Sequence, residues 1–212
     1  MTTDDIMRAA PVIPVLVLDG DGDWEGLART FVDNGLKVLE VTLRTPGALA
    51  AIRRMAAVDG AIVGAGTVLN PAQLDAALEA GSRFIVAPGL TDSLAQAAIA
   101  AAVPFLPGVA TAGDIMRGLD HGLDHFKFFP AETSGGLPAL KALAGPFGRV
   151  RFCPTGGIRA DNAGEWLAHP SVMCVGGSWL LKSGETDFTA VGDRARAAAA
   201  LRRTGANEAG PS

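Results

Sequence analysis

The stretch KVLEVTLR, residues 37–44, has two faces that differ in chemistry. Successive side chains of a β-strand point to opposite sides of the sheet. One face of this stretch is aliphatic and the other polar: Leu39, Val41 and Leu43 against Glu40, Thr42 and Arg44. If the chain forms a barrel, the aliphatic face must meet the helices, and the polar face then lies in the barrel interior, near the carboxyl ends of the strands. A purely structural Glu–Arg pair in the lumen would explain the same pattern.

Short apolar runs alternate with Ala-rich, helix-period segments along the whole chain. The predicted strands are 12–18, 37–43, 61–64, 83–87, 104–106, 125–129, 150–154 and 171–175. The predicted helices are 23–34, 47–57, 71–80, 92–102, 112–121, 136–144, 161–169 and 187–203. These units, spaced roughly 20 to 25 residues apart, predict an α/β fold. Their number favours a (β/α)₈ TIM barrel over an open doubly wound sheet.

The chain ends and helix starts add local predictions. Segment 2–10 is expected to form a short N-terminal helix over the barrel floor, and about 203–212 a flexible tail of one 1–212 barrel domain. Asn70 before Pro71 is typical of a helix start, and Thr91 and Asp161 are predicted caps of the helices that follow them.

Composition excludes several classes of protein. The net charge is −4 and the arginines are scattered, so neither a nucleic acid nor a membrane surface is an expected partner. The N-terminus lacks the apolar core of a signal peptide, which predicts a cytoplasmic location. The apolar window 94–112 is broken by Pro104 and Pro107 and is therefore not a membrane span. Cys153 and Cys174 lie in apolar runs and are predicted to be core residues.

HFKFFPAE, residues 125–132, places a lysine inside an apolar strand. Alternation sends Phe126 and Phe128 outward and leaves Lys127 and Phe129 facing the lumen. Burial disfavours the charged ammonium form and so favours the free amine, which is a nucleophile. A buried ion pair with Glu40 would share this geometry, and only entry of a carbonyl substrate separates the two interpretations.

Two glycine pairs predict a phosphate site. Barrels often bind phosphate in the loops after strands 7 and 8, where glycine lets backbone N–H groups approach an anion. The pairs lie in PTGGI, residues 154–158, and VGGSWL, residues 175–180, with Ser178 expected at a helix start. GAGTVLNP, residues 64–71, lacks the dinucleotide-binding pattern, so Thr67 is interpreted as a substrate-binding hydroxyl.

Other acid–base and metal chemistry finds little support in the sequence. His121, His125 and His169 lack metal-ligand spacing, so no metal is expected. The chain contains no tyrosine, so the acid–base partner of the lysine must be a carboxylate, for which Glu40 is the inward candidate.

Six motifs in this order resemble the 2-keto-3-deoxy-6-phosphogluconate (KDPG) aldolase and 4-hydroxy-2-oxoglutarate aldolase family: LEVTLRTP, GAGTVLNP, APGL, KFFPAE, PTGGI and VGGSWL. The resemblance runs from about residue 11 to 181 and implies a homotrimeric class I aldolase without cofactor. It implies Lys127 as the Schiff-base lysine and Glu40 as the general acid–base group. It further implies a set of substrate-binding residues: Arg44 and Thr67 for the pyruvate carboxylate, Pro88 and Phe129 as walls, Thr155 for the hydroxyls, and Gly156, Gly157, Gly176, Gly177 and Ser178 for the phosphate.

The implied reaction cleaves the phosphorylated sugar acid to pyruvate and glyceraldehyde 3-phosphate, and extends to 4-hydroxy-2-oxoglutarate, which yields pyruvate and glyoxylate. Three alternatives stay open at the level of sequence. VGGSWL favours the gluconate substrate over its 6-phosphogalactonate epimer. A phosphate-binding barrel isomerase or epimerase would use Glu40 as a base without an imine, and a sugar-phosphate sensor would bind without turnover.

Overall fold

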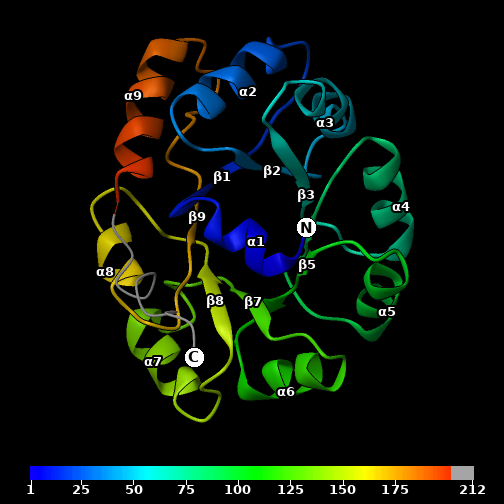
Figure 1. Cartoon of the computed structure of the whole chain (residues 1–212), viewed down its shortest axis with the longest axis vertical. Coiled ribbons are helices and arrows are strands. Elements are labelled where there is room, and N and C mark those ends of the chain that lie inside the picture. Colours follow the sequence, from blue (N-terminus) through cyan, green and yellow to red (C-terminus); the bar gives the residue numbers. More distant parts are fainter. Residues whose placement is uncertain (202–212) are drawn as a thin grey trace.

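The structure is a computed structural model that describes residues 1–201. A ring of parallel strands is enclosed by helices (Figure 1). The strands are β1 Val12–Leu16, β2 Val38–Thr42, β3 Ile62–Gly66, β4 Ile85–Val86, β5 Phe105–Leu106, β6 Gly108–Val109, β7 His125–Phe128, β8 Arg151–Pro154 and β9 Val175–Gly177. The helices are α1 Thr3–Arg8, α2 Trp24–Asp33, α3 Ala48–Ala56, α4 Pro71–Glu79, α5 Asp92–Ala100, α6 Ala112–Asp120, α7 Gly136–Ala144, α8 Ala163–Leu167 and α9 Phe188–Ala199.

Two hydrogen-bonded sheets join to close the barrel. One has the order β5-β4-β3-β2-β1-β9 and the other β6-β7-β8. Parallel bridges between Phe152 and Val172 and between Thr155 and Gly176 connect β8 to the segment that ends in β9. On the other side, β5 and β6 are one course of chain, separated only by Pro107. The predicted (β/α)₈ barrel is therefore confirmed.

The predicted strand 104–106 is wrong in its extent, because the fifth barrel strand is split into β5 and β6. Proline has no N–H to donate, so Pro107 interrupts the ladder to β4. Its carbonyl accepts instead from Lys127 N at 2.9 Å, which starts the ladder to β7. The same short segment thus links the two sheets.

Apolar side chains divide into two clusters, as strand alternation predicts. Leu39, Val41, Phe126 and Phe128 belong to the large cluster between the strands and the helices. A smaller cluster fills the lower lumen: Ile6, Met7, Ile13, Val38, Phe84, Val86, Leu106, Cys153, Met173 and Cys174. Both cysteines are buried in this lumen cluster, which confirms their prediction as core residues.

Helix α1 closes the floor of the barrel, as predicted. Thr2 caps the helix, since its hydroxyl accepts from Asp5 N and the Asp5 carboxylate accepts from Thr2 N. Ile6 and Met7 then point into the lumen cluster, where they are 2% and 0% exposed. Burial of these two side chains provides the apolar contact that holds a six-residue helix in place.

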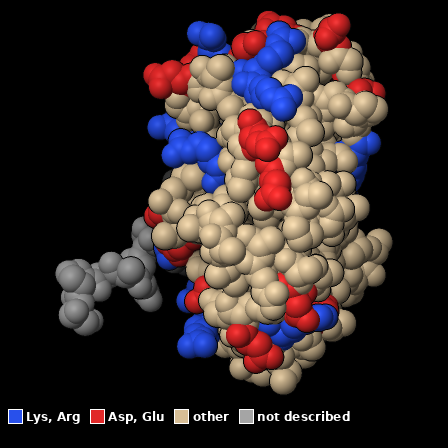
Figure 2. Space-filling model, turned by 90° about the vertical axis from the view of Figure 1, so that its right-hand side faces the viewer, with Lys and Arg blue, Asp and Glu red and all other residues tan. Residues whose placement is uncertain are grey.

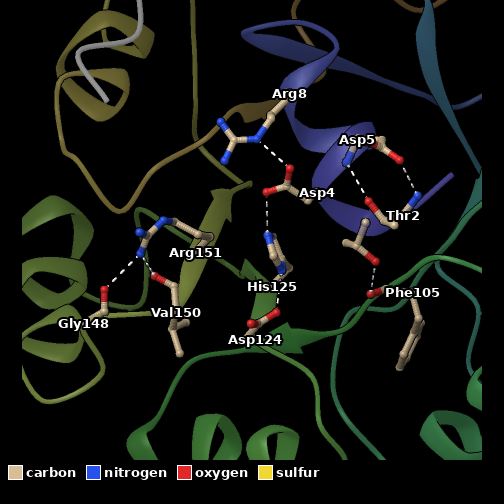
Figure 3. A network of polar contacts seen from close by, with 11 residues as sticks. Thr2, Asp4, Asp5, Arg8, Phe105, Asp124, His125, Gly148, Val150 and Arg151 are labelled. Atoms are coloured by element: carbon tan, nitrogen blue, oxygen red, sulfur yellow. Dashed lines mark hydrogen bonds and ion pairs between the residues drawn. The ribbon is translucent and has the colours of Figure 1, made fainter. Parts of the chain in front are cut away.

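A polar network anchors α1 to the base of β7 (Figure 3). Arg8 Nε donates to Asp4 Oδ2 at 2.5 Å, and Asp4 Oδ1 lies 3.3 Å from His125 Nε2. His125 Nδ1 lies 2.7 Å from Asp124 Oδ1. The Arg8 hydrogen bond is the main cause that lowers the pKa of Asp4, so this carboxylate is charged near neutrality. The barrel floor is thereby tied to the strand that carries Lys127.

Helix boundaries follow the predicted caps except at α8. Asn70 and Thr91 accept from the backbone N–H groups of Gln73 and Leu94, which confirms both predictions. Asp161 is not the cap of α8: the residue at that position is Asn162, whose side-chain oxygen accepts from Arg159 N instead. Helix α8 is consequently shorter than the predicted 161–169.

The carboxyl-terminal end of the chain differs from the prediction in one respect. Helix α9 ends at Ala199, whereas the pattern predicted a helix to residue 203. Both the end of that predicted helix and the predicted tail at 203–212 extend into residues outside the described range. The single 1–212 domain accordingly stays a prediction.

The surface carries charges of both signs. Figure 2 shows Lys and Arg interspersed with Asp and Glu, with broad uncharged areas between them. Across residues 1–201, no helix has the length and apolar character that crossing a membrane requires.

Removing the Met7 side chain tests the role of α1 as the barrel floor. Met7→Ala should lower the free energy of unfolding by about 2–5 kcal/mol, because it leaves a cavity in the lumen cluster. The same change at Met116, which is 57% exposed, should stay within about 0.5 kcal/mol. Urea unfolding followed by circular dichroism measures both, and equal effects at the two positions would contradict the lumen packing.

Candidate active site

Lys127 and Glu40 face each other inside the barrel. Lys127 Nζ lies 3.1 Å from Glu40 Oε1, and the side chains are only 6% and 4% exposed. Lys127 comes from β7 and Glu40 from β2, so barrel closure alone brings them together. Lys37, Lys141 and Lys182 are all exposed, which leaves Lys127 as the buried amine of the chain. Free charges are seldom buried without a partner, and each of these groups is the other's partner.

Gly66 makes room for the Glu40 carboxylate. Glu40 pairs with Gly64 in the ladder between β2 and β3, and Gly66 lies two residues further along β3. A Cβ atom on Gly66 would lie 2.1 Å from Glu40 Oε1. A side chain there would therefore push the carboxylate away from its place beside Lys127. Gly66 is not among the site residues predicted from the sequence.

Arg44 and Thr67 lie together at the mouth of the barrel. Arg44 Nε donates to Thr67 Oγ1 at 3.3 Å. Arg44 is exposed, so its predicted place in the barrel interior is wrong; it lies two residues beyond Thr42, the end of β2, where the chain has left the lumen. Thr67 has φ of +58°, a left-handed conformation that costs energy for a β-branched residue. The strained turn directs its hydroxyl toward Arg44.

Phe129 lies beside the lysine, and Pro88 lies beside the strand that pairs with it. The Lys127 Nζ atom lies 5.3 Å from the centroid of the Phe129 ring, within the range of a cation–π contact. Pro88 follows β4, and its carbonyl oxygen would lie 2.1 Å from a Cβ atom on Gly108. Gly108 is the residue paired with Lys127 between β6 and β7. Phe129 thus contacts the buried amine, whereas Pro88 lies against the strand neighbour of Lys127, and its role as a wall of the site stays a prediction.

Thr155 lies beside the second glycine pair. It follows β8, is 7% exposed, and forms a parallel bridge with Gly176. A Cβ atom on Gly176 would lie 2.3 Å from Thr155 Oγ1, so glycine is needed for the hydroxyl to fit. The two predicted phosphate segments are therefore neighbours in the barrel.

The glycines of these segments differ in local structure. Gly156 and Gly157 follow β8 and have φ of +100° and +81°, which glycine adopts readily. Gly176 and Gly177 belong to β9 itself, so the predictions that strand 171–175 ends before them and that they form a loop are wrong. Pairing with Ile13 and Pro14 of β1 extends the strand through them. Ser178 follows β9 in a loop, not at a helix start, because α9 begins only at Phe188.

An open cavity of about 570 Å³ adjoins this end of the barrel. It extends from Val15, the partner of Glu40 in the ladder between β1 and β2, to Ser178. The walls include Trp24, the first residue of α2, and Leu181, in the segment between β9 and α9. Its volume lies within the range of about 300–1,000 Å³ that is common for small-molecule sites.

The spacing of the three histidines predicts no metal site. Within residues 1–201, no three His, Cys, Asp or Glu side chains gather as a set that could hold a metal ion. His121 instead contacts Asp92 at 3.0 Å, and His125 belongs to the network below the barrel.

A buried amine that faces a carboxylate in a (β/α)₈ barrel is the arrangement that a lysine-dependent class I aldolase requires. Comparison with known families narrows this class. The model of the KDPG and KHG aldolase family matches residues 3–193, and the chain belongs to this family.

Individual relatives agree with this assignment. The 2-dehydro-3-deoxy-phosphogluconate aldolase of Zymomonas mobilis is 55% identical over 200 residues, which cover 94% of this chain and 96% of that protein. A crystal structure of the Zymomonas mobilis KDPG aldolase superposes with a TM-score of 0.95 at 54% identity, covering 97% of this chain and all of that one. The KDPG aldolase of Legionella pneumophila, described with pyruvate captured as a covalent carbinolamine, has a TM-score of 0.91 at 40% identity, covering 94% and 98% of the two chains.

Placing a methyl group on Gly66 tests the geometry of the pair. Gly66→Ala should displace the Glu40 carboxylate, and we expect the aldolase turnover number to fall roughly 100-fold while the protein stays folded. Gly164→Ala is the matched control, because no atom lies within 4 Å of its added Cβ position. Turnover is measured by coupled pyruvate detection, with circular dichroism as the check on folding. Unchanged turnover in Gly66→Ala would contradict the role of this glycine.

Proposed function

We propose that the chain cleaves 2-keto-3-deoxy-6-phosphogluconate to pyruvate and glyceraldehyde 3-phosphate through an imine on Lys127. The observation that carries the proposal is the buried contact of 3.1 Å between Lys127 Nζ and Glu40 Oε1. A carboxylate at this distance is able to take a proton from the ammonium group and release the free amine. The names of the relatives, all aldolases of this type, support the same substrate.

Imine formation is the first step of the mechanism. The Lys127 nitrogen attacks the C2 ketone of the substrate and forms a carbinolamine, the species that the Legionella pneumophila relative is described as holding with pyruvate. Loss of water then gives a protonated imine. This cation is an electron sink, and it forms in a pocket from which bulk water is largely excluded.

Cleavage of the carbon–carbon bond follows. Glu40 accepts the proton of the C4 hydroxyl as the C3–C4 bond breaks, and the electron pair of that bond moves to the imine nitrogen. Glyceraldehyde 3-phosphate leaves as the aldehyde and an enamine of pyruvate remains. Protonation of the enamine at C3, again by Glu40, and addition of water at C2 release pyruvate and free the lysine.

Substrate orientation is assigned to the residues around this pair. Arg44 and Thr67 bind the carboxylate next to C2, because a guanidinium gives charge-assisted hydrogen bonds to that group. The side walls are formed by Pro88 and Phe129, and Thr155 contacts the substrate hydroxyls. The phosphate lies at the far end, against backbone N–H groups of the two glycine segments and the Ser178 hydroxyl: Gly156, Gly157, Gly176 and Gly177.

Assembly and location form part of the same proposal. We propose a homotrimer, which the resemblance of the motifs implies and which static light scattering of the purified protein tests. A phosphorylated substrate carries charge that hinders its passage through membranes, which favours the predicted cytoplasmic location.

Replacing the nucleophile tests the imine directly. Lys127→Met should lower turnover by at least about 10³-fold, since no other buried amine is available to form the imine. Lys141→Met, a change of an exposed lysine in α7, should keep the wild-type rate.

Borohydride reduction in the presence of pyruvate separates an aldolase from a barrel isomerase or epimerase. Mass spectrometry should find one reduced pyruvyl group on the wild-type protein and on Lys141→Met, and none on Lys127→Met. Retained turnover in Lys127→Met, or a pyruvyl group on another residue, would reject the mechanism. A sugar-phosphate sensor would bind substrate without releasing pyruvate.

Substrate preference is tested with a panel of 2-oxo acids. We expect kcat/KM for the phosphorylated gluconate derivative to exceed that for its C4 epimer, the 6-phosphogalactonate derivative, by about tenfold or more. A difference of this size corresponds to the loss of one hydrogen bond to the C4 hydroxyl. 4-Hydroxy-2-oxoglutarate should also be cleaved, to pyruvate and glyoxylate, more slowly because it lacks the phosphate. A preference for the galactonate epimer would assign the chain to that specificity.

A further inference from the structure

We infer that Glu132 positions the Gly156–Gly157 loop and so sets the preference of the enzyme for phosphorylated over unphosphorylated substrates. The inference rests on the proposed function, and specifically on the assignment of this loop to the phosphate. Glu132 is the last residue of the KFFPAE motif, and the mechanism above assigns it no role.

Backbone hydrogen bonds join the end of β7 and the segment after it to the segment after β8. Thr155 N donates to Phe128 O at 3.0 Å, and Ala131 N donates to Thr155 O at 2.8 Å. Glu132 N then donates to Gly156 O at 3.1 Å. The chain that leaves the catalytic lysine strand is therefore bonded, residue by residue, to the start of the glycine loop.

The Glu132 side chain continues this contact on the far side of the loop. Its Oε1 atom accepts from Asn162 Nδ2 and from Trp166 Nε1, both at 3.2 Å. Asn162 also donates to Gly157 O at 3.2 Å and accepts from Arg159 N at 2.8 Å. One carboxylate oxygen thus holds the asparagine that closes the turn after Gly157.

Trp166 gives this contact a rigid anchor. The side chain is 2% exposed, and its ring packs against Phe128 with centroids 6.3 Å apart. A buried indole N–H needs an acceptor, which Glu132 supplies. Phe128 is next to Lys127 in β7. The contacts through Trp166 therefore hold the loop in a defined position relative to the strand that carries the nucleophile.

The glycine loop lies directly against the stem of Glu132. A Cβ atom on Gly157 would be 2.4 Å from Glu132 Cγ, and Gly157 has φ of +81°. The backbone at Gly157 therefore packs on the methylene groups of Glu132, with no side chain between them. Loss of the glutamate would leave this stretch of the loop without its support.

The two binding functions of the site differ in their dependence on this contact. The carboxylate and C2 end of the substrate lies near Lys127, Arg44 and Thr67, and within residues 1–201 none of these three forms a hydrogen bond with Glu132. The phosphate end depends on where the backbone N–H groups of Gly156 and Gly157 point. A positioning role for Glu132 should accordingly change binding of the phosphate and spare the chemistry at C2.

The experiment compares KDPG with 2-keto-3-deoxygluconate, which differs only by the phosphate. In Glu132→Ala, the ratio of kcat/KM for KDPG to kcat/KM for the unphosphorylated acid should fall about tenfold, the loss expected for a charged hydrogen-bond acceptor. The fall should appear in KM for KDPG, with kcat nearly unchanged. Glu132→Gln keeps an oxygen that accepts both N–H groups, and its ratio should stay within about threefold of the wild type.

Controls separate this inference from general damage. Glu165→Ala, which removes an exposed carboxylate of α8, should leave the ratio unchanged. Equal losses on both substrates in Glu132→Ala, or no loss on either, would overturn the inference.

A binding measurement needs no turnover. Calorimetric titration with inorganic phosphate should show weaker binding to Glu132→Ala than to the wild type, and equal binding would also overturn the inference. Phosphate binding by a wild-type protein that forms no imine with pyruvate would reject the proposed function alone.

Discussion

The contact between Lys127 and Glu40 is the interaction on which the rest of the site depends. Removing two charged groups from water costs several kcal/mol for each ion, and a short contact between them offsets this cost only in good geometry. The two residues are 87 positions apart in the chain, so the contact exists only in the closed barrel. The lumen below them is filled by apolar side chains, which exclude water and strengthen the electrostatic effect of each group on the other.

Glycines shape this lumen by leaving space. Gly66 accommodates the Glu40 carboxylate, Gly176 accommodates the Thr155 hydroxyl, and Gly108 allows the Pro88 carbonyl to approach β6. At each of these positions the missing side chain belongs to one strand and the group that fills the space to the adjoining strand or the loop that follows it. A barrel interior has a fixed volume, so polar side chains fit only where neighbouring strands carry small residues. These glycines therefore make room for groups of the site, and none of them is required by a turn.

Much of the fold and the central pair could be predicted because both follow from periodicity. Alternation along β2 and β7 placed Glu40 and Lys127 on the lumen side, and apolar neighbours such as Phe126 and Phe128 on the helix side. Periodicity gave less information at strand ends. Arg44 lies beyond the point where alternation still determines direction, and the glycines of β9 have a composition typical of a loop although pairing with β1 makes them a strand.

Local spacing and hydrophobicity were enough to predict the succession of strands and helices, the inward faces of β2 and β7, and the identity of the buried amine. Which groups meet across the barrel depends on the tertiary structure. The space that Gly66 leaves for Glu40, the strained turn at Thr67 beside Arg44, and the bonds from Asn162 and Trp166 to Glu132 each join separate elements. Such contacts depend on strand register and loop course across the closed barrel, which no local pattern of residues encodes.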